Sequence, residues 1–186
     1  MKFNKSILAV VAAMSMTGAV VSAQAETTTV AGGVVHFTGS LVNAACSVSN
    51  ESADKEVVLG QYRTAQLVDA DSMTAQIPFT LVLEDCDPVT AGVTTAAVAF
   101  SGQHIDGRPD LLMVGSHTNK QSASNVGIQI LDEGGKIAPL DGSTGTTAHT
   151  LIKGENTLSF SARYVSLGGA TEGDADADAT FTMIYE

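Results

Sequence analysis

Apolar and polar residues alternate with a period of two along most of the chain, and no long segment shows the period of a helix. Glycine, aspartate, serine and threonine fill the connections between the alternating segments. Short alternating strands with turn residues between them predict an all-β sandwich. The predicted strands lie in residues 76–86, 95–100, 124–132, 156–166 and 176–186. Residues 61–67, "QYRTAQL", are expected to form a helical turn.

Two consecutive segments near the N-terminus place their apolar residues at positions of opposite parity. In residues 26–38 the odd positions form the apolar face, which consists of Ala31, Gly33, Val35 and Phe37. After Gly39 the favoured positions become even, and they are Val42, Ala44, Cys46 and Val48. A change of parity turns every side chain to the opposite face of a sheet. We therefore expect residues 26–38 to be an independent strand-forming arm and residues 41–48 to be a separate segment of the core.

The first residues have the pattern of an export signal. Lys2 and Lys5 precede a short apolar stretch, and "AQA" at residues 23–25 is a small-residue cleavage site. We predict a signal peptide at 1–25, an arm at 26–38 and one domain at 39–186. The two cysteines, Cys46 and Cys86, follow the predicted cleavage site, and an exported chain enters an oxidising compartment, so one disulfide is expected.

Charge and motifs argue against several classes of function. The net charge of −11 disfavours binding to nucleic acid and to anionic membranes. Neither a nucleophile elbow nor a phosphate or dinucleotide loop is present, although a triad assembled in space leaves no sequence motif. The aspartates of residues 174–178 lack the glycine and glutamate of a calcium loop, and we interpret them as a solvated strand face. Residues 84–87, "EDCD", are interpreted as a polar strand end beside the disulfide. The four histidines are scattered: His36, His104, His117 and His149.

We therefore expect no enzymatic activity, no metal ion, no cofactor, no nucleic acid partner and no small-molecule substrate. The motifs that remain are the export signal, "GGVVHFTGSLVNAACSV" at 32–48, a second cysteine forty residues after the first, and "ATFTMIYE" at 179–186. Together they resemble the major subunits of type 1 fimbriae, in the chaperone–usher pilin family, over essentially the whole chain. The resemblance implies an incomplete immunoglobulin-like β-sandwich that lacks its final strand and is completed in trans by a donor strand.

The resemblance also implies roles for particular residues. The donor arm would insert the side chains of Ala31, Gly33, Val35 and Phe37 into a neighbouring subunit. The groove and the chaperone would meet Phe181, Met183, Tyr185 and the terminal carboxylate of Glu186. Cys46 and Cys86 would form the family disulfide. Asp176 and Asp178 make the last strand more acidic than the family pattern, which leaves the start of that strand open.

The implied function is that of a structural subunit of an adhesive fimbria on the bacterial surface, exported through the periplasm. Its implied partners are identical subunits in a helical fibre, a periplasmic chaperone and an outer-membrane usher. The alternatives are a minor or adaptor pilin near the fimbrial tip, and a self-contained secreted β-sandwich that binds a ligand or catalyses hydrolysis.

Overall fold

A computed structural model describes residues 27–115 and 121–186. The chain divides into two units, Met1–Gly39 and Ser40–Glu186. The predicted signal peptide, residues 1–25, lies outside the described residues, as does His117. In the first unit, residues 27–39 contain no helix or strand, and their side chains are exposed.

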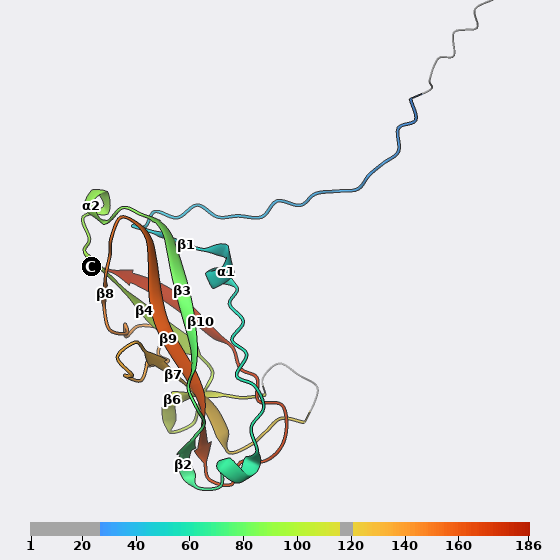
Figure 1. Ribbon diagram of the computed structural model, residues 1–186, viewed down its shortest axis with the longest axis vertical. Coiled ribbons are helices and arrows are strands. Elements are labelled where there is room, and N and C mark those ends of the chain that lie inside the picture. The colour runs from blue at the N-terminus through green and yellow to red at the C-terminus, as the bar shows by residue number, and fades with distance from the viewer. Residues whose placement is uncertain (1–26, 116–120) are drawn as a thin grey trace, which may run out of the picture. The chain divides into compact units, whose positions relative to one another are not determined.

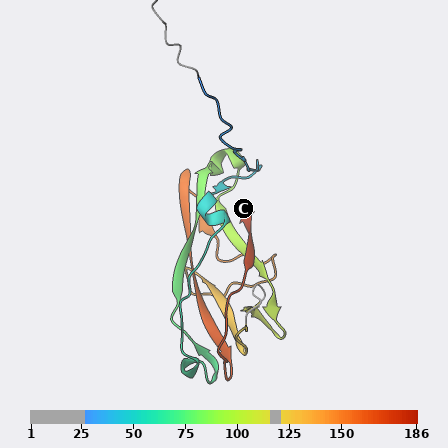
Figure 2. The same ribbon diagram turned by 90° about the vertical axis from the view of Figure 1, so that its right-hand side faces the viewer.

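The second unit contains two antiparallel sheets (Figures 1 and 2). The larger sheet has the order β1-β3-β9-β7-β6-β5, with β2 also paired to β9, and the smaller has the order β10-β4-β8. The strands of the larger sheet are β1 (Ser47–Val48), β2 (Ala70–Met73), β3 (Ile77–Cys86), β5 (His104–Ile105), β6 (Arg108–Met113), β7 (Val126–Asp132) and β9 (Gly154–Leu167). Those of the smaller sheet are β4 (Thr95–Gly102), β8 (His149–Thr150) and β10 (Ala179–Tyr185). The all-β fold is confirmed.

The five strongest alternating segments of the sequence form β3, β4, β7, β9 and β10. Their inward residues build one hydrophobic core between the sheets. A line of aromatic rings crosses it: Phe79 stacks on Phe160 with centroids 5.6 Å apart, and Phe160 meets Phe100 edge-on at 5.3 Å. Phe100 in turn lies 6.4 Å from Phe181 of β10. These contacts connect the larger sheet to the last strand of the smaller one.

Three short helices lie between the strands in the described residues. The 3-10 helix η1 (Thr64–Gln66) confirms the helical turn expected there. Two further turns, α1 (Asn50–Ala53) and α2 (Pro88–Ala91), were not predicted. Each begins with a side-chain cap: Ser49 accepts a hydrogen bond from the Ser52 N–H, and Asp87 accepts one from the Thr90 N–H. Because β3 ends at Cys86 and Asp87 caps α2, residues 84–87 are a polar strand end beside the disulfide, as expected.

The prediction that residues 41–48 form a core segment is wrong for its first half. Val42 and Ala44 are exposed, whereas Ala45 and Cys46 are buried. Backbone pairing supplies the reason, because the Ala45 C=O accepts a hydrogen bond of 2.9 Å from the Asp87 N–H. The segment is held from Ala45 onward by this bond, by the disulfide and by β1.

The interpretation of residues 174–178 as a strand face is wrong about the strand, although Ala175 and Ala177 pack against the core and Asp176 and Asp178 are exposed, as the alternation predicted. The strand β10 begins only at Ala179. Before it, the backbone bonds to a loop instead of to β4: the Asp174 C=O accepts from the Ala123 N–H, and the Asp176 C=O accepts from the Gly115 N–H. These bonds direct the aspartates out of the sheet.

Asp132, at the end of β7, is a buried carboxylate that anchors two loops. It accepts hydrogen bonds from the Lys136 N–H at 2.9 Å and from the N–H and hydroxyl of Thr147. Burial opposes its charged form, but these hydrogen bonds outweigh burial and lower the pKa of Asp132. Replacing Asp132 with alanine is expected to reduce the free energy of unfolding by about 2 kcal/mol at pH 7.

The pH dependence of this effect follows from the lowered pKa. The stabilisation is present above the pKa of about 4 of an unfolded aspartate and is lost as pH falls through the folded value. Urea unfolding of the wild-type and Asp132→Ala chains at pH 7 and pH 3 checks this, with exposed Glu133→Ala as the control. An equal difference between the two chains at both pH values contradicts the assignment.

Candidate functional site

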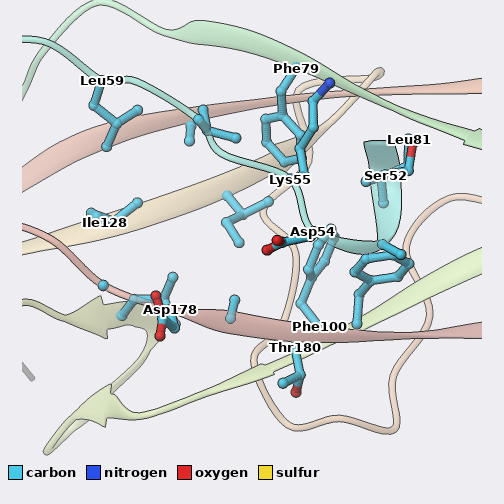
Figure 3. Close-up of a pocket in the computed structure, with 18 of the residues that line it drawn as sticks. Ser52, Asp54, Lys55, Leu59, Phe79, Leu81, Phe100, Ile128, Asp178 and Thr180 are labelled. Atoms are coloured by element: carbon cyan, nitrogen blue, oxygen red, sulfur yellow. The ribbon is translucent and has the colours of Figure 1, made fainter. Parts of the chain in front are cut away.

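An open groove of about 690 Å³ runs beside the first half of β10 (Figure 3). One wall is the segment 53–59, which follows α1, and the other wall is the segment 177–181. Core side chains of both sheets form its floor: Phe79, Leu81, Phe100, Leu112, Ile128, Ile130 and Ala162. The groove therefore reaches down to the apolar core of the second unit, beside the free edge of β10.

The floor belongs to the packed interior. Leu81 is 2% exposed, and Phe100 is 4% exposed. Polar groups occur only on the walls and at the rim, where Ser52, Asp54, Lys55, Asp178 and Thr180 lie. An apolar trough of this kind suits apolar side chains presented on an extended backbone.

The edge of β10 beside the groove has no strand partner in the described part of the chain. On its other side β10 pairs with β4, where Glu186 and Thr95 exchange two backbone hydrogen bonds of 3.1 and 2.9 Å. Because such pairs alternate in an antiparallel ladder, the odd residues of β10 direct their N–H and C=O groups toward the groove. These residues also turn their side chains to the core, and they are Ala179, Phe181, Met183 and Tyr185.

Of the four predicted groove residues, one lines the groove and three lie further along the chain. Phe181 lines the groove. Met183 and Tyr185 are half-buried against the core beyond it, and the Tyr185 hydroxyl donates to the Cys46 C=O at 3.4 Å. Burial raises the pKa of Tyr185. Glu186 is exposed, and one oxygen of its terminal carboxylate accepts hydrogen bonds from the N–H groups of Thr94 and Thr95.

Sequence reasoning missed the opposite wall. Lys55, Val57 and Leu59 line the groove at every second position of "DKEVVLG". That alternation is a signal in the sequence, although it covers only three positions. The Lys55 ammonium bonds to the Glu51 carboxylate at 2.8 Å, so this wall carries a local ion pair at its outer side.

The two cysteines form the expected disulfide. Cys46 and Cys86 are bonded to each other, and both are buried. The bond joins Cys46, two residues before Val48 of the groove lining, to the end of β3.

The predicted donor residues lie in the first unit. Val35 is 74% exposed and Phe37 is 92% exposed, and Ala31 and Gly33 are exposed as well. The apolar side chains of this alternation are therefore uncovered in the isolated subunit.

Within 27–115 and 121–186, no three histidine, cysteine, aspartate or glutamate side chains gather as metal ligands. None of the helices described there is long and apolar enough to cross a membrane.

Comparisons with known proteins agree with this geometry. The family model described as "Fimbrial protein" matches residues 35–186. The type-1 fimbrial protein A chain of Salmonella typhi is 47% identical over 186 residues, 100% of both chains. The fimbrial subunit type 1 of Salmonella typhimurium is 50% identical over 174 residues, 93% of each chain.

Solved structures show the same fold. A chain from a chaperone–usher pilus studied for rod uncoiling is 29% identical, with a TM-score of 0.71 over 87% of this chain and 100% of its own. The P pilus rod subunit PapA is 27% identical, with a TM-score of 0.64 over 77% of this chain and 100% of its own. The fold is thus the incomplete immunoglobulin-like sandwich of pilins. This chain belongs to the fimbrial protein family and is a structural subunit of an extracellular surface fimbria.

Proposed function

We propose that this subunit polymerises head to tail by donor-strand exchange. In this proposal residues 26–38 of one subunit are the donor arm and residues 39–186 are the pilin domain that accepts it. The single observation that carries the proposal is the groove beside the unpaired edge of β10, which opens onto the apolar core. An alternating apolar strand placed there completes both the sheet and the core.

The lengths of arm and edge agree. The apolar face of the arm spans residues 31–37, and the β10 edge spans Ala179–Tyr185, so each contains seven residues. Side chains of both strands point to the core only if odd residues of the arm stand opposite odd residues of β10. The two strands then have four inward residues each, in matching positions.

Side-chain size sets the direction of the arm. The open groove lies at the start of β10, beside Phe181, whereas Met183 and Tyr185 already fill the far end. The bulky Phe37 suits the open end, and the small Ala31 suits the filled end. This arrangement is antiparallel, which is also the more stable pairing. It places Phe37 opposite Ala179, Val35 opposite Phe181, Gly33 opposite Met183 and Ala31 opposite Tyr185.

The energetics favour such an exchange. Burying the Val35 and Phe37 side chains contributes roughly 1.5–3 kcal/mol each, and the ladder adds backbone hydrogen bonds. One arm and one groove per subunit form a contact that does not close on itself, so repetition builds an open helical filament. The function of the subunit is then mechanical, as an element of an adhesive fimbria, and we assign it no enzymatic activity and no cofactor.

The same groove accounts for the assembly partners. An unpaired edge beside an exposed core aggregates unless it is covered. We propose that a periplasmic chaperone covers it with a strand of its own before an outer-membrane usher directs the exchange. The exposed Glu186 carboxylate then lies where a basic cleft of the chaperone can bind it, alongside the end of β10.

A cross-linking experiment tests the proposed pairing. In this register Val34 stands opposite Thr182 in a non-hydrogen-bonded pair, whose Cα atoms are about 4.5 Å apart. Thr182 is exposed, so the oxidant has access to it. Fibres of a Val34→Cys, Thr182→Cys chain should oxidise to a ladder of covalent multimers on non-reducing gels.

The control pairs Val34→Cys with Thr157→Cys, an exposed residue on the outer face of β9. This pair is expected to give monomers after the same treatment. Monomers from the Val34–Thr182 pair, in preparations that still contain fibres, would contradict the register.

A further inference from the structure

Leu41 is a large apolar side chain that its own subunit leaves in water. It is 104% exposed, and residues 40–44 around it are exposed and contain no helix or strand. The chain joins the domain at Ala45, which is buried and whose C=O accepts a backbone hydrogen bond. Leu41 also continues the odd-numbered apolar face of the arm, four residues after Phe37. The exposed apolar alternation therefore runs past residue 38, the predicted end of the arm.

The groove ends at a pair of tyrosine rings. Its walls are residues 53–59 and 177–181, and Tyr62 follows the first wall by three residues. The Tyr164 hydroxyl donates to the C=O of Ala175, two residues before the second wall, at 3.1 Å. The two rings meet edge-on with their centroids 5.9 Å apart. The pair therefore connects the ends of the two walls, and both side chains are only half-buried.

The next step rests on the donor-strand function proposed above. In that register Leu41 stands opposite Ala175, the residue that the Tyr164 hydroxyl contacts. We infer that Leu41 of the inserted chain packs on the Tyr62–Tyr164 pair of the acceptor and anchors the strand at this end of the groove. Both surfaces face water before assembly, so their contact removes apolar area from water. The occupant is a second copy of this chain, because Leu41 is continuous with the arm that fills the same groove.

The contact shortens the linker between consecutive domains of the fibre. From an inserted Phe37 to Ala45 of its own domain there are eight residue steps, which reach at most about 28 Å. From an inserted Leu41 to Ala45 there are four steps, which reach at most about 14 Å. Leu41 therefore holds two consecutive domains close together and limits bending at the junction. It also fixes the register, because a shift of the arm by two residues moves Leu41 off the rings.

The test measures how fast fibres of the full chain dissociate. The appearance of monomer is followed at a fixed elevated temperature. Fibres of Leu41→Ala are expected to dissociate about five- to twentyfold faster than wild type, because most of the apolar contact is lost. Val42→Ala changes the neighbouring residue, which is 65% exposed and points to the opposite face, and its rate should stay within about twofold of wild type. Leu41→Met keeps the volume and should restore the slow rate.

The thermal midpoints of the unassembled variants separate this effect from folding. Leu41→Ala and Val42→Ala should both match wild type, because both side chains are exposed in the subunit. Failure of Leu41→Ala alone to assemble, with an unchanged midpoint, is the same effect at its extreme and supports the contact.

Variants of the acceptor test the other side of the contact. Tyr62→Ala should also speed dissociation, and Leu41→Ala added to it should change the rate little further, since the two residues act through one contact. Tyr62→Phe keeps the ring and should dissociate like wild type. A wild-type rate in Leu41→Ala, or effects that multiply in the double variant, overturns the inference. The Val34–Thr182 cross-link separates the two levels: its presence together with either result refutes the Leu41 contact alone, and its absence refutes the donor-strand register beneath it.

Discussion

Replacing Val35 with aspartate is expected to abolish fibre assembly, whereas the same replacement at Val34 should leave fibres largely intact. The two valines are neighbours and are similarly exposed in the subunit, at 74% and 80%. They differ in which face of the arm they occupy, because successive residues of a strand point to opposite faces. In the proposed register Val35 points into the groove opposite Phe181, and Val34 points outward opposite Thr182.

The physical reason is the cost of placing a carboxylate on the floor of the groove. The lining there consists of apolar core side chains, and the lysine on the wall, Lys55, is already bonded to Glu51. Burying an unpaired carboxylate costs several kcal/mol, which reduces the association constant by at least about a hundredfold. At Val34 the carboxylate stays in water, so the cost of burying a charge does not arise.

Fibre yield by electron microscopy and sedimentation checks this prediction, together with the thermal midpoint of each unassembled subunit. Both variants should match the wild-type midpoint, because both side chains are exposed before assembly. Equal fibre yields from Val35→Asp and Val34→Asp would show that the groove does not select the odd-numbered side chains of the arm. A lowered midpoint in Val35→Asp alone would assign Val35 a role inside its own subunit.

Much of the fold is predictable from the sequence because alternation is a local signal. In β3, β9 and β10 apolar residues occupy every second position, and the structure buries or half-buries those faces against one core. The short helices carried signals as well: Ser49 and Asp87 are capping residues, and Pro88 stands at the first turn of α2. The errors occurred at Val42, which is exposed, and in residues 174–178, which keep the alternation but bond to a loop instead of to β4.

The groove was less predictable because it is a space between segments far apart in the chain. Residues 53–59 and 177–181 form its walls, and its floor comes from both sheets. The sequence showed that Phe181 and Phe37 each belong to an apolar face. It did not show that a strand is missing between two walls, since that depends on the order of strands in the smaller sheet. The resemblance to pilins supplied that expectation, and the structure supplied the residues of the first wall.

Breaking the disulfide with Cys46→Ser is expected to lower the free energy of unfolding by about 4 kcal/mol. In the chain-entropy model that value follows from the loop closed between cysteines separated by 40 positions. A domain of this size is stable by about 5–15 kcal/mol, so the loss is a large fraction of the total. Urea unfolding of the unassembled subunit and the periplasmic yield measure the effect.

The position of the bond makes assembly sensitive to it as well. Between the disulfide and the first wall lies β1, which has only two residues, paired to Leu83 and Glu84. Without the disulfide, the segment before this wall is held to β3 and its end by backbone hydrogen bonds of Ala45 and Ser49 and by the Ser52 hydroxyl of α1. We expect the wall, and with it the shape of the groove, to be less well fixed. The double variant Cys46→Ser, Cys86→Ser should be destabilised as much as the single one, because the link and not either thiol is responsible. Unchanged urea midpoints in both variants, or in wild-type protein reduced with dithiothreitol, would show that β1 and α1 hold the wall unaided.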